Sequence, residues 1–291
     1  MKLSHIFEKR IPTLSFEVFP PKTSGNYESV KFATSEIAKL GPDFMSVTCG
    51  AGGKTDVYTA DIASSISRDY GVTSIAHMTC VGTSKADAEK RIRELENLGI
   101  ENVLGLRGDI PEGFDINTCD FRHASELTAF IKSISDICVG GACYPEGHPE
   151  SANIKEDILH IKEKVEAGCD FLTTQMFFDN HIFYKYLCKL RDAGVNVPVV
   201  AGIMPVTNKS QIYRICKLSG TYMPSRFINI VDRFGDDPEA MKQAGIIYAT
   251  EQIIDLLANG VNAIHVYSMN KPDVAEKIQS NLSHIIPKKD V

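Results

Sequence analysis

The feature that most constrains the fold of this chain is a repeated alternation of two residue patterns. Short apolar runs rich in β-branched residues alternate with stretches in which apolar residues recur every three or four positions. The first pattern predicts buried strands and the second predicts amphipathic helices. The apolar runs cover residues 14–19, 44–50, 73–80, 102–109, 138–145, 171–178, 197–205 and 262–270. Strands that alternate with helices at roughly thirty-residue spacing predict a (β/α)8 TIM barrel, a fold of the α/β class.

The stretches between these runs carry further signals of helices. Clear helical periodicity covers residues 27–40, 85–99, 155–168 and 183–194. Glycine readily adopts the left-handed conformation that ends a helix, and suitable glycines stand before the next strand at Gly41, Gly71, Gly99, Gly168, Gly194 and Gly260. We expect the first dozen residues to form an extra helix laid against the barrel. Residues 220–239 are expected to be an insertion before the eighth strand.

The chain shows no Pro/Gly/Ser-rich linker, low-complexity tract or break in composition, which favours one domain over residues 1–291. A doubly wound parallel sheet is the alternative architecture. That fold commonly carries a glycine-rich dinucleotide motif, G-x-G-x-x-G, after its first strand, and this motif is absent from the corresponding part of the sequence. The barrel is therefore the better interpretation.

Composition excludes several classes of protein. The 31 Lys+Arg against 37 Asp+Glu give a net charge of −6, and no long basic block suggests a nucleic-acid surface. No apolar run approaches the length of a membrane-spanning helix, and the amino terminus lacks the apolar core of a secretory signal, so a cytoplasmic location is expected. None of the 8 cysteines forms a C-x-x-C pair; we expect them to be reduced and mostly buried, without a metal site.

Polar residues gather at the predicted carboxyl ends of the strands, where TIM-barrel enzymes carry their chemistry. One polar group in a strand is common, but a set of them at a single rim predicts an active site. The set comprises Glu17, Thr48, His77, Arg107, Asp109, Tyr144, Glu146, His148, Gln175, Ser268 and Asn270.

Glu17 is the sharpest single candidate because it interrupts an apolar run that Pro20 and Pro21 end. Burial among aromatic side chains raises a carboxyl pKa, which suits a general acid that works near neutral pH. The alternative is a glutamate paired with a buried arginine or lysine. Asp109 follows Arg107 closely in the sequence, and its alternative role is an ion pair with that arginine.

Two segments imitate other sites. Residues 49–55, CGAGGKT, resemble a phosphate-binding loop, but Thr48 stands where that motif needs its first glycine. The segment EGHPE places a histidine between carboxylates without the spacing of a metal site, so we interpret it as a polar loop that lines a ligand cleft.

The motifs SFEVFPPKT, VTCGAGG, HMTC, LRGDIP, CYPEGHPE, TTQMFFD, GIMPV and YSMN occur in the order found in methylenetetrahydrofolate reductases. From about residue 12 to residue 285 the chain resembles the catalytic barrel of that family. Regulation through the long C-terminal domain of the family's eukaryotic members is not expected. The resemblance implies a flavin at the carboxyl rim. It also implies reduction of 5,10-methylenetetrahydrofolate to 5-methyltetrahydrofolate, in which hydride passes in two half-reactions from NADH or NADPH to the flavin and then to the folate.

The resemblance also implies roles for individual residues. Glu17 matches the general acid that protonates folate N10, and Asp109 matches the residue beside the flavin and pterin. Gln175, Gln211 and Lys271 match folate contacts, although relatives carry an arginine at the last position and lysine lacks its bidentate geometry. The implied flavin-binding residues are Thr48, Cys49, Ala51, His77, Arg107, Gly108, Asp109, Ala124, Tyr144, His148, Asp157, His160 and Lys164.

Some expectations stay open at this level. The resemblance makes FAD the default cofactor. Glu163 stands where some relatives have an arginine near the dinucleotide phosphates, and His160 where some have an asparagine. An acidic side chain there disfavours a pyrophosphate, so FMN is the second possibility. The hydride donor is NADH, NADPH or a protein partner, and the chain is expected to form a homo-oligomer or join a redox complex. The alternative functions are a flavin-free, folate-dependent one-carbon transferase and a flavin subunit that takes electrons from a protein partner.

Overall fold

The computed structural model, which describes residues 1–21, 24–49 and 56–286, confirms the barrel. Parallel strands close into a ring in which each strand pairs with its neighbour in the sequence and the last pairs with the first. Their bounds are β1 Thr13–Val18, β2 Phe44–Val47, β3 Thr73–Thr79, β4 Asn102–Leu106, β5 Cys138–Cys143, β6 Phe171–Thr174, β7 Val199–Ile203 and β8 Ala263–Tyr267. Each strand lies on a predicted apolar run, except that β1 begins one residue earlier.

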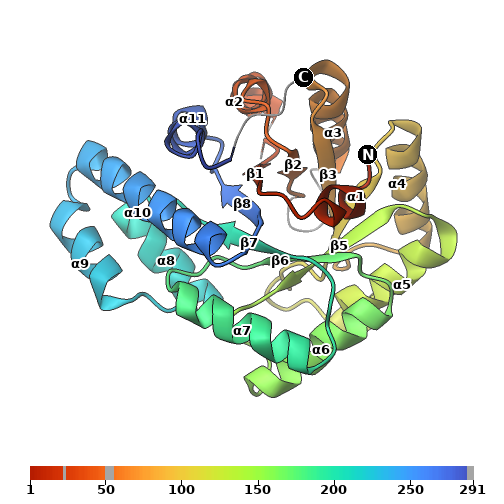
Figure 1. Cartoon of the computed structure of the whole chain (residues 1–291). Helices are drawn as coiled ribbons and strands as arrows, with labels where there is room; N and C mark the ends of the chain where they lie inside the picture. The colour runs from red at the N-terminus through yellow and green to blue at the C-terminus, as the bar shows by residue number, and fades with distance from the viewer. Residues whose placement is uncertain (22–23, 50–55, 287–291) are drawn as a thin grey trace.

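Apart from α1, the helices lie around the outside of the strands (Figure 1). Their bounds are α1 Leu3–Glu8, α2 Tyr27–Lys39, α3 Asp56–Tyr70, α4 Lys85–Asn97, α5 Ala124–Ile134, α6 Ile154–Glu166, α7 Asn180–Asp192, α8 Lys209–Ser219, α9 Ser225–Phe234, α10 Pro238–Ala258 and α11 Pro272–Asn281. The insertion predicted before β8 contains α9. All six glycines expected to end helices have φ between +67° and +106°.

The short helix α1 closes the amino-terminal end of the barrel. Leu3 and Ile6 are buried in one cluster with Phe44 and Phe171, which begin β2 and β6. The backbone N–H of Leu3 also donates to Asn102 Oδ1 at the start of β4 (2.7 Å). The predicted amino-terminal helix is therefore present, and it occupies the end of the barrel opposite the rim that carries the polar residues.

Two glycines allow large side chains to fill the barrel interior. A Cβ on Gly140 in β5 would lie 2.2 Å from Cζ of Phe171, and a Cβ on Gly202 in β7 would lie 2.4 Å from the hydroxyl of Tyr267. Both separations are far below van der Waals contact, so only glycine fits the observed packing.

The cysteines are all free, as expected for reduced thiols, and most are buried. Within residues 1–21, 24–49 and 56–286, no three His, Cys, Asp or Glu side chains group closely enough to hold a metal ion. Over the same residues, no helix combines the length and apolar character needed to cross a membrane.

Candidate active site

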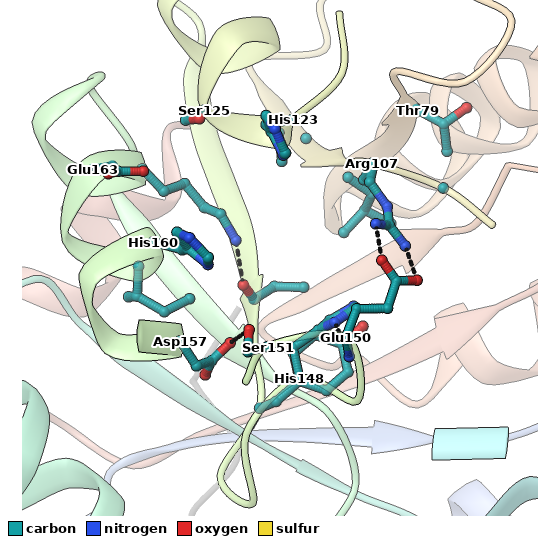
Figure 2. A pocket seen from close by; sticks show the side chains of 18 of the residues that line it. Thr79, Arg107, His123, Ser125, His148, Glu150, Ser151, Asp157, His160 and Glu163 are labelled. Atoms are coloured by element: carbon teal, nitrogen blue, oxygen red, sulfur yellow. Dashed lines mark hydrogen bonds and ion pairs between the residues drawn. The ribbon is translucent and has the colours of Figure 1, made fainter. Parts of the chain in front are cut away.

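A cavity of about 500 Å³ opens at the carboxyl-terminal rim, a size typical of small-molecule sites. Residues at or after the ends of β2, β3, β4 and β5 line it, together with the start of α5 and one face of α6. Ten of the predicted flavin-binding residues contribute to its walls: Cys49, Arg107, Gly108, Asp109, Ala124, Tyr144, His148, Asp157, His160 and Lys164. Figure 2 shows Asp157 and His160 on one side and Arg107 with Glu150 on the other.

Three predicted flavin-binding residues are not among those that line the cavity. Thr48 follows β2, and its backbone N–H and C=O bond to Val18 and to the Thr59 hydroxyl. His77 is buried inside the barrel, where its Nε2 lies 3.7 Å from a carboxylate oxygen of Glu17. Ala51 lies outside the described residues.

Arg107 forms its ion pair with Glu150, on the loop after β5. Its two terminal nitrogens donate to the two carboxylate oxygens at 2.5 and 2.7 Å, and Figure 2 shows the paired groups. The hydrogen bonds raise the pKa of Arg107 and lower the pKa of Glu150. Asp109, by contrast, is exposed at the cavity wall and forms no hydrogen bond or ion pair with Arg107 among the described contacts. The carboxylate nearest in sequence is therefore not the arginine's partner.

Helix α6 supplies a buried carboxylate and an ammonium group to the cavity. Asp157 is 3% exposed; Ser151 Oγ lies 3.4 Å from its Oδ1, and its Oδ2 has no hydrogen-bond partner within the described residues. Burial raises the pKa of Asp157. Lys164 donates to the carbonyl of Ala142 at 2.6 Å, and burial of its ammonium lowers the pKa of Lys164.

These groups meet the requirements of a flavin. An unpartnered buried acceptor such as Asp157 Oδ2 is costly unless a ligand donates to it, and the hydroxyls of a ribityl chain are suitable donors. Lys164 supplies positive charge for polar or anionic parts of such a ligand, whereas the guanidinium of Arg107 is already paired with Glu150. The donor and acceptor set therefore fits a long ligand with hydroxyl and anionic groups.

The loop after β5 is organised by its own side chains. The rings of Tyr144 and His148 meet edge to face at 4.7 Å, and the backbone N–H of Glu150 donates to His148 Nδ1 at 3.1 Å. Because Nδ1 accepts that bond, a neutral His148 carries its proton on Nε2. Burial lowers the pKa of His148, which favours the neutral ring. Glu146 reaches away from the cavity and accepts from the backbone N–H of Tyr222 at 2.6 Å.

Glu17 lies inside the barrel next to the rim and is 8% exposed. Its carboxylate is 3.5 Å from Ser46 Oγ, 3.7 Å from His77 Nε2 and 3.9 Å from His265 Nε2. Among the described residues, no arginine or lysine pairs with it. His77 and Thr79 point to the same face of β3, and Thr79 lines the cavity, so the Glu17 cluster lies beside the cavity.

The predicted folate contacts lie elsewhere on the rim. Gln175 follows β6 and accepts from the backbone N–H of Met176 at 2.9 Å. Lys271 follows β8 and donates to Thr207 Oγ1 at 2.5 Å, which joins the loops after β7 and β8. Gln211 is exposed on α8. These three residues are not among the cavity-lining residues and are not brought together with its walls.

Two rim residues chosen from the sequence support the backbone. Ser268 donates to the carbonyl of Glu17 at 2.6 Å. Asn270 accepts from the backbone N–H of Phe19 and donates to its carbonyl, at 2.8 and 2.9 Å. Both side chains hold the end of β1, where Glu17 lies, to the segment after β8.

Several cavity residues were not singled out by sequence reasoning: Thr79, His123, Ser125 and Ser151. Thr79 had a usable signal, because it lies two residues beyond His77 on the same strand. His123 precedes α5, and its N–H donates to Glu126 Oε2, a pairing that the H-x-x-E spacing suggests. Ser125 and Ser151 had no local signal.

The sequence profile of the family described as methylenetetrahydrofolate reductase matches residues 2–283. Methylenetetrahydrofolate reductase 1 of Schizosaccharomyces pombe is 34% identical over 97% of this chain and 47% of its own length. The 5,10-methylenetetrahydrofolate reductase of Escherichia coli is 31% identical over 91% of this chain and 88% of its own length. The chain spans about half the length of the yeast and plant relatives it matches.

Solved structures share the barrel. A protein from Clostridium thermocellum, described as binding two copies of 5-methyl-5,6,7,8-tetrahydrofolic acid, superposes with a TM-score of 0.69 at 15% identity, over 98% of this chain and 100% of its own. Phosphonopyruvate hydrolase superposes with a TM-score of 0.56 at 11% identity, over 98% of this chain and 84% of its own. At these identities the likeness concerns the fold alone.

Proposed function

The chain belongs to the methylenetetrahydrofolate reductase family, and we propose that it reduces 5,10-methylenetetrahydrofolate to 5-methyltetrahydrofolate with hydride from NADH or NADPH. The observation that carries this proposal is the buried carboxyl of Glu17 beside a rim cavity lined by ten residues that match the family's flavin positions. The relatives' names supply the reaction class. The residues of this chain supply the acid and the binding groups.

A flavin bound in the cavity would supply the hydride-carrying chemistry, by accepting hydride from the nucleotide and passing it to the folate. Asp157 would accept from its hydroxyls, and Arg107 and Lys164 would face its polar groups. Glu163 is exposed at the cavity wall, where its charge is screened by solvent and opposes a phosphate only weakly. We therefore propose FAD, as the family resemblance implies, with FMN as the second possibility.

Glu17 would act as the general acid of the folate half-reaction. Opening the five-membered ring of the substrate requires a proton on the nitrogen that leaves the methylene carbon, N10. A carboxyl group held within a nearly dry barrel interior can deliver that proton without competition from water.

The residues that would contact the folate from the rim are Asp109, Gln175, Gln211 and Lys271. Lys271 would act as a single point charge.

Glu17→Gln tests the proposed function. Glutamine keeps the size and hydrogen bonding of the side chain but cannot donate the proton. Folate reduction should fall by at least about 100-fold, the usual contribution of a general acid. Bleaching of the flavin by NADH or NADPH in anaerobic stopped-flow measurements should keep its rate, because that step needs no acid. Near-normal folate turnover in the variant would remove Glu17 from the mechanism.

The cofactor is tested separately on the purified wild-type protein. Heat release followed by mass spectrometry should identify FAD, and the absorbance spectrum should show an oxidised flavin. Release of FMN alone would correct the dinucleotide and leave the hydride chemistry in place. A colourless protein that still binds tetrahydrofolate would instead support the flavin-free one-carbon transferase.

A further inference from the structure

Both glutamates of the loop after β5 bond to other parts of the rim. Glu150 pairs with Arg107, which follows the neighbouring strand β4. Glu146 accepts from the backbone N–H of Tyr222 at 2.6 Å, and Tyr222 lies between α8 and α9, at the start of the insertion before β8. Because β4 and β7 lie on opposite sides of β5 in the ring of strands, the loop is attached on both flanks. Only the attachment through Glu150 belongs to the cavity wall.

Packing adds a second contact between this loop and the connection from α8 to α9. Gly220 has φ of +70°, and a Cβ placed on it would lie 3.7 Å from Cγ of Pro149, an ordinary van der Waals distance. The connection is itself fixed, because the N–H of Thr221 donates to the carbonyl of Cys216 at 3.2 Å and Thr221 is only 9% exposed. The loop therefore rests on a segment that has a defined position.

The bond of Glu146 to Tyr222 does not depend on a charge pair. Oε2 of Glu146 accepts that bond, and Oε1 is buried without a hydrogen-bond partner among the described residues. Burial raises the pKa of Glu146 against the bond from Tyr222, which lowers it, and the charge of Asp179 raises it as well. These surroundings use the oxygen as an acceptor and disfavour the negative charge. A neutral glutamine would meet the same requirement.

The same loop carries two aromatic rings of the cavity wall. Tyr144 and His148 both line the cavity, and their rings meet edge to face at 4.7 Å. The backbone N–H of Gly147 donates to the carbonyl of Tyr144 at 2.9 Å, so residues 144–147 form a tight turn with Glu146 at its third position. A side chain that is fixed at this point of the turn also fixes the backbone that carries both rings.

We propose that Glu146 is a positioning residue of the cofactor site, which holds Tyr144 and His148 in place through its bond to the insertion. The inference rests on the proposed function, because it takes the cavity to be the flavin site. Glu146 is not among the cavity-lining residues and touches no flavin in this scheme. A loop that already has its binding position costs the ligand no further ordering, so the bond increases the affinity for flavin. The insertion before β8 thereby takes part in cofactor binding.

The dissociation constant of the flavin measures this effect. It is obtained by dilution of the flavin-loaded protein, with the released flavin followed by its fluorescence. Glu146→Ala should raise the dissociation constant by at least about 10-fold, because the loop then spends time in positions unsuited to binding. Glu146→Gln should stay within about 2-fold of the wild type, because its amide oxygen accepts from the same N–H.

The matched control is Tyr222→Ala. The side chain of Tyr222 is 52% exposed, and the bond to Glu146 uses only its backbone N–H, which alanine keeps. This variant should therefore bind flavin as the wild type does. A loss equal to that of Glu146→Ala would show that the tyrosine ring, and not the bond to Glu146, supports the site, and would overturn the proposal.

Hydrogen–deuterium exchange of the purified proteins measures the bond itself. The amide of Tyr222 should be protected in the wild type and in Glu146→Gln, and should exchange at least about 10-fold faster in Glu146→Ala. Faster exchange should be confined to residues 144–153 and 220–222. Unchanged protection of the amides in the barrel strands would show that Glu146→Ala is folded, so that a loss of flavin is a local effect.

A double variant tests the route by which Glu146 acts. If Glu146 acts through the loop, then Glu146→Ala should weaken flavin binding less in a His148→Ala background than it does alone. Equal losses in the two backgrounds would show that Glu146 acts by another route. A Glu146→Gln variant as weak as Glu146→Ala would show that the charge matters and not the bond. Either result would overturn the positioning role.

Failure of this inference differs from failure of the proposed function. Flavin affinity that is unchanged in Glu146→Ala, while the amide of Tyr222 exchanges faster, would refute the positioning role alone. Wild-type protein that binds no flavin would refute the flavin-dependent function. In that case the exchange of the Tyr222 amide would still show whether Glu146 holds the loop against the insertion.

Discussion

At the scale of single residues, the carboxylates around Arg107 differ in what they contact. Glu150 forms two short hydrogen bonds with the guanidinium. Asp109 is exposed at the cavity wall without such a bond. Because Arg107 is hydrogen-bonded to Glu150 and not to Asp109, the charge of Asp109 is less compensated and is better placed to act on a flavin or folate.

Asp109→Asn should therefore change redox behaviour more than stability. Loss of a negative charge near the flavin makes the anionic reduced form easier to reach, so the midpoint potential should rise and hydride delivery to folate should slow. Folate affinity should fall by about 10-fold or more if the carboxylate hydrogen-bonds the pterin, since such a charged bond contributes about 1.5–3 kcal/mol. Spectroelectrochemistry and folate titration measure the two effects.

The matched control is Asp115→Asn, which removes a charge from the same loop. Asp115 caps a short 3-10 helix, Ile116–Thr118, through its side-chain oxygen, and asparagine can keep that bond. Asp115 is not among the residues that line the cavity. Equal changes of potential in the two variants would show that Asp109 acts only through the overall charge of the loop.

At the scale of elements, the end of β1 is held by residues that follow β8. Asn270 has φ of +53° and forms two hydrogen bonds with the backbone of Phe19, and Ser268 bonds to the carbonyl of Glu17. Asparagine tolerates the left-handed conformation better than most residues, and its amide can donate and accept at once. Asparagine therefore suits this position both in its backbone conformation and in its hydrogen bonds.

Asn270→Ala should lower the free energy of unfolding by about 2–4 kcal/mol, through two lost hydrogen bonds and left-handed strain. Asn270→Gly should lose roughly 1 kcal/mol less, because glycine accepts the conformation without strain. Folate reduction should suffer in both variants, since the backbone that carries Glu17 loses its support. Chemical denaturation and steady-state rates provide the measurements. Identical losses of stability in the two variants would exclude strain as a component.

At the scale of the whole molecule, the barrel interior holds ionisable groups away from water. His77 is 8% exposed, its Nε2 has no hydrogen-bond partner within the described residues, and burial lowers its pKa to about 4. An unfolded chain would bind a proton at His77 near pH 6.5, while the folded protein would not. The unfolded state therefore gains protons first as the pH falls, and stability falls with it.

Between pH 6.5 and pH 4, this histidine should cost up to about 3 kcal/mol of the free energy of unfolding, at roughly 1.4 kcal/mol per pH unit. His77→Gln should abolish that part of the acid sensitivity, because glutamine does not titrate. Chemical denaturation of the flavin-free wild type and variant at pH 7 and pH 4.5 tests this. Carboxylates that titrate in this range do so in both proteins, so their contribution cancels in the comparison. Parallel losses of stability in wild type and variant would contradict it.

The amino-acid sequence by itself predicted the architecture of this protein. Strand and helix periodicity are local properties, and eight alternations leave few ways to bury the apolar faces, so strand order, α1 and the insertion before β8 followed from them. The carboxyl-terminal rim was predicted for the same reason, because parallel strands end together. Most residues predicted at the flavin site consequently line one cavity.

Tertiary structure alone decided which side chains meet. Arg107 pairs with Glu150, 43 positions away, although Asp109 lies two positions away. His265 reaches Ser46 and Ser15 across sequence separations of 219 and 250 residues, and His77 points into the barrel and not into the cavity. These contacts depend on strand register and on closure of β8 against β1. Local sequence patterns encode which face a side chain takes, but they do not encode the partner that closure brings opposite it.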